Sequence, residues 1–173
     1  MPLTEEMPIA WGKMVSSEFK TKVIGISNRL GVAVNYLMAA MAFETGRTFD
    51  PSITNPNSGA TGLIQFMPST ARNLGTTTDA LRVMSAVEQL DYVEKYFQPY
   101  RGRLTTLEDV YMAILWPKAI GKPNDYVLFA EPSIYYTQNR GLDINSDGQV
   151  TKAEASSKVK DSLIEGLTSS NQG

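Results

Sequence analysis

The sequence predicts a mainly α-helical fold, with six or seven helices and one long irregular region. Apolar residues recur at helical spacing in several segments. Capping-box sequences of the Ser/Thr-x-x-Glu type precede two of these segments. Between residues 47 and 67 a run rich in Pro, Asn, Ser and Gly interrupts the pattern, which leaves room for a short hairpin at most. A chain of 173 residues, 42% of them hydrophobic, is long enough to form one domain with a buried core.

The first two helices are predicted on either side of a glycine. Ser16 or Ser17 is expected to cap a helix that ends near Leu30. The next helix, residues 32–44, is apolar on nearly all sides and is therefore expected to be buried. It ends at Glu44, where the helix dipole and the apolar surroundings both disfavour the ionised carboxylate. The sequence therefore predicts a carboxyl group that resists ionisation.

The later elements are predicted from caps and breaks. A long irregular run such as 47–67 is uncommon in a compact domain and is usually functional. A helix is predicted from Pro68 to near Gly75. One capping box, Ser85–Glu88, begins a helix that ends near Gln98, and a second, Thr105–Glu108, begins a helix that ends at Trp116-Pro117. A helix or strand is predicted over Tyr126–Ala130, and a last helix over Lys152–Leu167 is followed by a frayed tail.

The composition excludes several kinds of chemistry. The chain has no cysteine and no histidine, so thiolate nucleophiles, disulfides, the Ser-His-Asp triad and most zinc sites are excluded. Carboxylate, lysine and tyrosine side chains remain for acid–base work. The net charge of −2 gives no reason to expect nucleic acid as a partner.

Two motifs at one spacing resemble a known family. Glu44-Thr45-Gly46 is followed by Gly59-Ala60-Thr61-Gly62-Leu63-Ile64-Gln65-Phe66-Met67-Pro68-Ser69-Thr70-Ala71. These stretches resemble the soluble (SLT) type of lytic transglycosylase domain, which is related to goose-type lysozyme. That family has Glu-Ser-Gly at the end of a core helix and then Gly-Ala-x-Gly-Leu-Met-Gln-x-Met-Pro-x-Thr-Ala. The resemblance covers about residues 30–120 and implies a lysozyme-like helical fold with a short hairpin or loop region after the catalytic helix, within a single domain spanning 1–173.

The resemblance implies a peptidoglycan-degrading enzyme that cleaves the β-1,4 bond between N-acetylmuramic acid and N-acetylglucosamine. Glu44 would be the single catalytic acid and base. In a lytic transglycosylase the muramyl 6-hydroxyl attacks and a 1,6-anhydro product forms, whereas in a lysozyme water attacks. Glycoside hydrolysis usually needs a second carboxylate. Asp50 and Glu131 are the candidates, but no pattern assigns either of them a role, which favours the transglycosylase.

Three alternatives remain open. The protein is a hydrolytic muramidase, a non-catalytic module of the same fold that binds cell wall, or a calcium-binding interaction protein in which the Glu44 stretch is structural. Presence of both Glu44 and Gln65 favours the enzyme over the binding module.

The resemblance also implies substrate contacts. Gln65 would line the sugar groove and Trp116 would stack on a sugar ring. The family has a later Ala-Tyr-Asn-Ala-Gly segment whose tyrosine reaches the catalytic glutamate. This chain lacks Tyr-Asn there, so either Tyr111 or Tyr136 is expected to supply the phenol. The predicted substrate-binding residues are Thr45, Gly62, Gln65, Phe66, Tyr111, Trp116 and Tyr136.

A second site is predicted near the C-terminus. Residues 143–154 match the twelve-residue calcium loop of the EF-hand, with a glycine at position 6 and a glutamate at position 12. A structural Ca²⁺ that fixes the last helix is expected, and no cofactor is expected for catalysis. The alternative is a polar loop before a helix capped by Thr151 and Glu154. The expected ligands are Asp143, Asn145, Asp147, Gln149 through its carbonyl, Glu154, and Thr151 directly or through water.

The N-terminal segment bears on location. Residues 1–14 lack the cationic start and continuous apolar run of a secretory signal, and no window holds the ~18 apolar residues of a membrane span. We expect a monomer without membrane insertion, made in the host cytoplasm and acting on peptidoglycan glycan strands of the cell wall or periplasm. Resemblance around Trp116-Pro117 and 136–143 favours a phage endolysin or virion-associated murein hydrolase, with a bacterial enzyme as the alternative.

Overall fold

The computed structural model describes residues 8–173 and is 54% helix and 6% strand, which confirms the mainly α-helical prediction. Residues 1–7, which carry part of the expectation about a signal segment, lie outside the described residues. The helices are α1 (Ser17–Leu30), α2 (Val34–Glu44), α3 (Pro68–Asn73), α4 (Thr78–Arg82), α5 (Ala86–Phe97), α6 (Leu107–Leu115), α7 (Ile134–Gln138) and α8 (Lys152–Gly166), and the strands are β1 (Val127–Ala130) and β2 (Gln149–Thr151). Short 3₁₀ turns cover Gly12–Met14, Gln98–Tyr100, Pro117–Ala119 and Arg140–Leu142.

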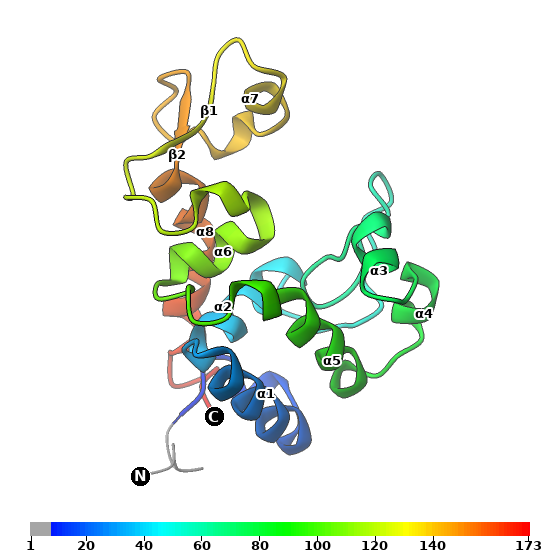
Figure 1. Cartoon of the computed structure of the whole chain (residues 1–173). Helices are drawn as coiled ribbons and strands as arrows, with labels where there is room; N and C mark the ends of the chain where they lie inside the picture. The colour runs from blue at the N-terminus through cyan, green and yellow to red at the C-terminus, as the bar shows by residue number, and fades with distance from the viewer. Residues whose placement is uncertain (1–7) are drawn as a thin grey trace.

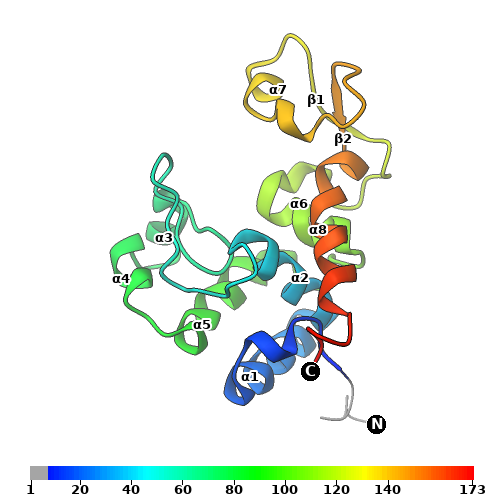
Figure 2. The same ribbon diagram turned by 180° about the vertical axis from the view of Figure 1, so that it is seen from behind.

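Helix α2 lies at the centre of the molecule, and the other elements surround it (Figure 1). It packs against α8, α6 and α1, while α1 also packs against α5. Residues from Leu37 to Ala42 are at most 1% exposed, which confirms the predicted buried helix. Helices α3 and α4 lie on one side of α2, and β1, β2 and α7 lie at the opposite end from the C-terminus (Figures 1 and 2).

The first helix forms as its sequence predicts. The Ser16 hydroxyl accepts a hydrogen bond from the Phe19 amide, and Gly31 ends the helix in the left-handed conformation with a φ of 68°. The buried face carries Phe19, Val23, Ile26 and Leu30. Serine satisfies a free amide at the start, and glycine adopts the positive φ at the end without a steric penalty.

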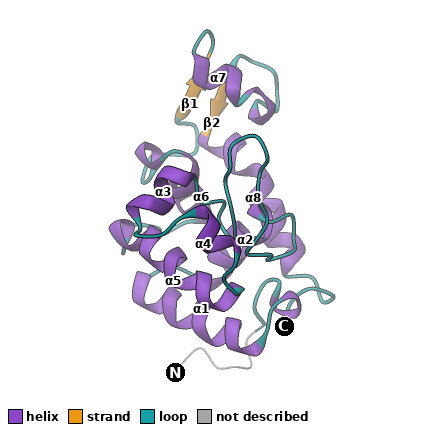
Figure 3. Cartoon of the chain, turned by 90° about the vertical axis from the view of Figure 1, so that its right-hand side faces the viewer, coloured by secondary structure: helices purple, strands orange, loops and turns teal. Residues whose placement is uncertain are grey.

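The long connection after α2 contains only isolated β-bridges, which join Thr61 to Thr54 and to Phe66. This confirms that the segment has no more regular structure than a short hairpin. Pro68 occupies the first turn of α3, as predicted. Helix α4 was not predicted, because one turn of five residues is too short to show a hydrophobic period. Figure 3 shows this loop-rich part, in teal, facing the viewer together with α3 and α4.

The two predicted capping boxes have different outcomes. Ser85 and Glu88 form both hydrogen bonds of the box at the start of α5. The box predicted at Thr105 is wrong, because Thr106 caps α6 and its hydroxyl accepts from the Asp109 amide. The shift of one residue buries Leu107 and places Asp109 inside the protein, where it meets Lys152.

The undecided segment Tyr126–Ala130 contains a strand. β1 and β2 pair antiparallel, with Phe129 opposite Val150, and both side chains are buried. The strand depends on this pairing with a segment about twenty residues later, which a local pattern cannot show.

The predicted frayed tail is wrong. The backbone of Gly173 exchanges two hydrogen bonds of 3.0 Å with Ile9, and the Lys13 amide donates to the Asn171 carbonyl at 3.0 Å. The indole of Trp11 donates to the Ser162 carbonyl of α8 at 3.0 Å. These contacts supply backbone partners for the last residues and bring the described N-terminal segment against the end of α8.

The helices were compared with the length and apolar composition that a membrane span needs. In residues 8–173 no single helix is both long enough and apolar enough to cross a bilayer. Helices α1 and α2 meet the criteria only as a pair, and they are bent by 117° at their junction.

Candidate active site and cation loop

Glu44 is the last residue of α2, and its side chain is half-buried at the start of the irregular loop. Burial raises the pKa of this carboxyl group to about 7. The predicted resistance to ionisation therefore follows from the fold as well as from the helix end. Near neutral pH the group is divided between its acid and its carboxylate, as an acid–base catalyst requires.

Two tyrosines lie within electrostatic reach of Glu44. Burial and then the Glu44 charge raise the pKa of Tyr111 above its usual value. Burial, then Tyr100 and then Glu44 raise the pKa of Tyr96 to about 12. Both phenols therefore remain protonated at neutral pH and present neutral hydroxyl groups in this region.

Tyr111, on α6, is one of the two phenols that the sequence left open for this position. It is 6% exposed and packs edge-on against Phe43, with ring centroids 5.7 Å apart. Tyr96, on α5, was missed. Its hydroxyl donates to the Ala113 carbonyl at 2.6 Å, and its ring packs edge-on against Phe66. The spacing of four residues from Tyr92 to Tyr96 on α5, continued by Tyr100 in the 3₁₀ turn after it, is the sequence signal that could have predicted an aromatic row here.

Gln65 is half-buried and adopts a φ of 54°, an uncommon conformation for a residue with a side chain. Its amide nitrogen donates to the carbonyls of Ile53 and Gly62, both at 3.2 Å. The two N–H groups of the side chain are thus used within the loop, which leaves the amide oxygen as the acceptor for a bound molecule. Such strained backbone occurs preferentially at functional sites.

Thr45 and Phe66 are corrected from substrate contacts to interior residues. Thr45 is fully buried, and its hydroxyl donates to the Met41 carbonyl at 2.8 Å and accepts from the Phe49 amide at 2.9 Å. Phe66 is 2% exposed. Both side chains support the loop from inside, so neither reaches a glycan in this conformation.

The predicted substrate contact of Gly62 stays a prediction. Gly62 is buried, its amide donates to the Ile53 carbonyl at 2.8 Å, and its own carbonyl accepts from the Gln65 amide at 3.0 Å. Its polar groups are therefore engaged within the loop.

Tyr136 is corrected from a phenol near Glu44 to a support of residues 143–154, the predicted cation loop. It is 4% exposed, and its hydroxyl donates to Asp143 Oδ2 at 2.7 Å. Trp116 is half-buried and packs edge-on against Phe129 and Tyr135, with ring centroids 5.1 and 5.2 Å apart. Its predicted stacking on a sugar ring stays a prediction.

The two candidate second carboxylates are engaged elsewhere. Asp50 is exposed and accepts hydrogen bonds from the hydroxyl and the amide of Ser52, at 2.7 and 2.8 Å, and these bonds lower its pKa. The carboxylate of Glu131 lies beside Gly148, at the cation loop. The arrangement therefore presents Glu44 as an acid–base group to which neither of these carboxylates is paired.

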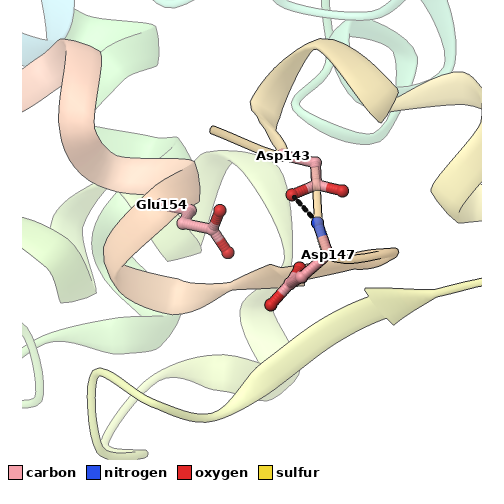
Figure 4. Close-up of side chains that lie close together, drawn as sticks. All are labelled: Asp143, Asp147 and Glu154. Carbon is pink, nitrogen blue, oxygen red and sulfur yellow. Dashed lines mark hydrogen bonds between the residues drawn. The ribbon is translucent and has the colours of Figure 1, made fainter. Parts of the chain in front are cut away.

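The predicted cation loop brings three acidic side chains together. One carboxylate oxygen from each of Asp143, Asp147 and Glu154 lies within 4.8 Å of the other two. Glu154 projects from the start of α8 toward the two aspartates (Figure 4). Because Ca²⁺–oxygen distances are about 2.3–2.6 Å, two ligand oxygens of one ion lie at most about 5.2 Å apart. The spacing would therefore allow one oxygen-liganded cation to contact all three carboxylates.

The backbone of the loop is shaped by its own carboxylates. Asp143 Oδ2 accepts from the Gly148 amide at 3.0 Å, and Gly148 has a φ of 83°, which glycine adopts readily at the sixth loop position. The Tyr136 hydroxyl is the main cause of a lowered pKa at Asp143. Thr151 and Glu154 also form the capping box at the start of α8. The capped helix that the sequence offered as the alternative to a calcium loop is therefore present together with the cluster of carboxylates.

Comparison with known proteins identifies one family. Residues 22–101, just under half of the 173-residue chain, match the family described as Transglycosylase SLT domain. No curated protein matches the chain. The match makes residues 22–101 similar to the lytic transglycosylase and lysozyme-like family that the sequence motifs resemble. It includes Glu44 and Gln65 but ends before α6, so Tyr111, Trp116 and the cation loop lie outside it. The resemblance predicted from the sequence, about 30–120, begins and ends later.

Proposed function

We propose that this chain, whose residues 22–101 match the SLT domain, is a peptidoglycan lytic transglycosylase with Glu44 as its acid–base catalyst. The observation that supports Glu44 most directly is its half-buried position at the end of α2, where burial raises its pKa to about 7. A carboxyl group with this pKa can donate a proton and later accept one at the same pH.

The proposed reaction needs only one carboxyl group. Protonated Glu44 donates its proton to the glycosidic oxygen as the bond to the muramyl anomeric carbon breaks. The resulting carboxylate then accepts the proton of the muramyl 6-hydroxyl, whose oxygen bonds to that anomeric carbon and closes the 1,6-anhydro ring. Asp50 is engaged with Ser52 and Glu131 lies at the cation loop, which favours this intramolecular attack over water activated by a second carboxylate.

Digestion of purified peptidoglycan tests the proposal. The wild type should release 1,6-anhydro-muropeptides detectable by mass spectrometry, and Glu44→Gln should release none above background. Glu18→Gln, on the exposed first turn of α1, is the matched control and should digest like the wild type. Reducing-end products would instead identify a hydrolytic muramidase, and equal digestion by Glu44→Gln would exclude Glu44 as the catalyst.

We propose separately that the loop 143–154 binds a structural Ca²⁺. The support is an all-oxygen donor set in which three carboxylates lie within 4.8 Å of one another, since such a set is mutually repulsive without a cation. Asp143, Asp147 and Glu154 would hold the ion, with Asn145 and the Gln149 carbonyl as further ligands. Bound Ca²⁺ would fix the start of α8 against β1 and β2. Calcium should raise the melting temperature relative to EDTA, and superimposable melting curves would exclude the site.

A further inference from the structure

Gln89, on α5, connects three separate segments from a fully buried position. Its amide oxygen accepts from the Leu63 amide at 2.7 Å. Its amide nitrogen donates to the Pro51 carbonyl at 2.9 Å and to the Leu81 carbonyl at 3.0 Å. One side chain thus fixes two points of the irregular loop and the single turn of α4 to α5.

The contact at Leu63 continues to Gln65 through short local hydrogen bonds. Gly62, next to Leu63, donates to the Ile53 carbonyl at 2.8 Å. The side chain of Gln65 donates to the same Ile53 carbonyl and to the Gly62 carbonyl. The strained backbone and the side-chain direction of Gln65 are therefore set by a part of the loop that Gln89 holds in place.

Gly62 shows how closely the loop approaches Gln89. A Cβ atom at this position would lie 2.3 Å from Gln89 Oε1, and the φ of Gly62 is 88°. A distance under 3.0 Å requires either the loop or the amide to move. Glycine is therefore required at position 62 both by the positive φ and by the close approach to the side chain of Gln89.

We propose that Gln89 is the positioning residue that holds the loop 59–67 and orients Gln65 for the glycan cleaved at Glu44. This inference rests on the proposed function for its catalytic consequence. A glutamine supplies one acceptor and two donors from one planar group, which matches one amide and two carbonyls. A leucine of similar size would leave all three backbone groups without these partners in a buried place.

The test compares kcat and KM of the wild type, Gln89→Leu and Val93→Ala on purified peptidoglycan. Val93 is a fully buried neighbour one turn along α5, and its truncation removes packing without touching the amide contacts. At a temperature where all three proteins are folded, Gln89→Leu should lower kcat on the order of 100-fold, as expected for a displacement of about 1 Å at the site. Val93→Ala should keep kcat within about twofold of the wild type. Equal kcat values for Gln89→Leu and the wild type would overturn the proposal.

Gln89→Glu separates hydrogen bonding from packing if Gln89→Leu does not fold. A protonated glutamic acid can accept from the Leu63 amide and donate to one carbonyl, whereas a carboxylate would face both carbonyls of Pro51 and Leu81. The ratio of its kcat to that of the wild type at the same pH should therefore rise as pH falls. A ratio that does not change with pH would contradict the role of the amide.

Amide hydrogen exchange tests the positioning without any activity. The Leu63 amide should be protected in the wild type and in Val93→Ala, and should lose that protection selectively in Gln89→Glu at neutral pH and in Gln89→Leu. A wild type that is inert on peptidoglycan would refute the proposed function, and the exchange rates would still decide the positioning. Unchanged protection of the Leu63 amide in both Gln89 variants would refute the positioning role of Gln89.

Discussion

Lys152 Nζ lies 2.5 Å from Asp109 Oδ1, and the two side chains are only 2% and 5% exposed. The ammonium group also donates to the carbonyls of Ala119 and Lys122, at 3.0 and 2.8 Å, so all three of its donors have partners. Asp109 Oδ1 accepts as well from the Gly121 amide at 2.9 Å. This buried ion pair joins the start of α8, where the cation loop ends, to the start of α6, which carries Tyr111.

Breaking this pair should be strongly destabilising. Lys152→Met keeps most of the volume of the side chain but leaves the carboxylate of Asp109 without its cation inside the protein. We expect a loss of about 3–5 kcal/mol in the free energy of unfolding, measured by urea denaturation. The double variant Asp109→Leu/Lys152→Met, which leaves no unpaired charge, should recover much of this loss. A cost for Lys152→Met below about 1 kcal/mol would mean that the pair is solvated.

The raised pKa of Glu44 predicts how stability depends on pH. The carboxyl group has a pKa of about 7 in the folded chain and about 4.5 when unfolded, so the folded state binds more protons between these values. The stabilising contribution is fully present below pH 4.5 and is lost as pH rises through the folded pKa of about 7.

Glu44→Gln should remove this dependence, because the amide does not ionise. Between pH 4.5 and above 7, the free energy of unfolding of Glu44→Gln should therefore rise relative to that of the wild type by about 3 kcal/mol. Urea denaturation across this range measures the difference. Parallel curves for the two proteins would show that Glu44 ionises as freely in the folded state as in the unfolded state.

Tyr136→Phe tests the assignment of this phenol to the cation loop, and it rests on the calcium proposal. The variant removes the hydrogen bond of 2.7 Å that orients Asp143. Loss of such a partner of a metal ligand should weaken Ca²⁺ binding about 10–100-fold, measurable by isothermal titration calorimetry. Glycan cleavage, assayed at saturating calcium, should remain near that of the wild type because Tyr136 is bonded within the cation loop.

Tyr135→Phe is the matched control for that experiment. Tyr135 is the adjacent residue and is 50% exposed, and its hydroxyl makes no hydrogen bond within residues 8–173. Its removal should leave calcium affinity unchanged. Equal affinities of Tyr136→Phe and the wild type would show that the Asp143 contact does not act on the ion.

Much of the fold can be predicted from local sequence. The caps at Ser16 and Ser85, the apolar composition of residues 34–44 and the proline at position 68 each act within one or two turns. The helix starts and the buried helix that they specify can therefore be predicted from neighbouring residues alone. The same holds for the position of Glu44 at the end of a buried helix, and for the loop 143–154, whose oxygen donors are contiguous in sequence.

Contacts between distant segments decided the rest. Strand β1 exists because residues 149–151 pair with it, and the last residues are ordered because Ile9 supplies their hydrogen bonds. The residues next to Thr45 and Phe66 in sequence do not indicate whether these side chains face the interior or a bound glycan. Only the packing of the folded chain showed that both face inward. Tyr136 and Tyr111 were indistinguishable by residue type, and only their partners separated them.

The sequence by itself determined most of the helices, the position of Glu44 at the end of an apolar helix and the acidic loop, because short-range backbone preferences and hydrophobic spacing govern these features. The tertiary structure alone decided which side chains surround that acid and what holds Gln65. The reason is physical: the pKa of a carboxyl group and the direction of a loop depend on atoms brought together from α2, α5 and α6, and no single stretch of the chain contains them.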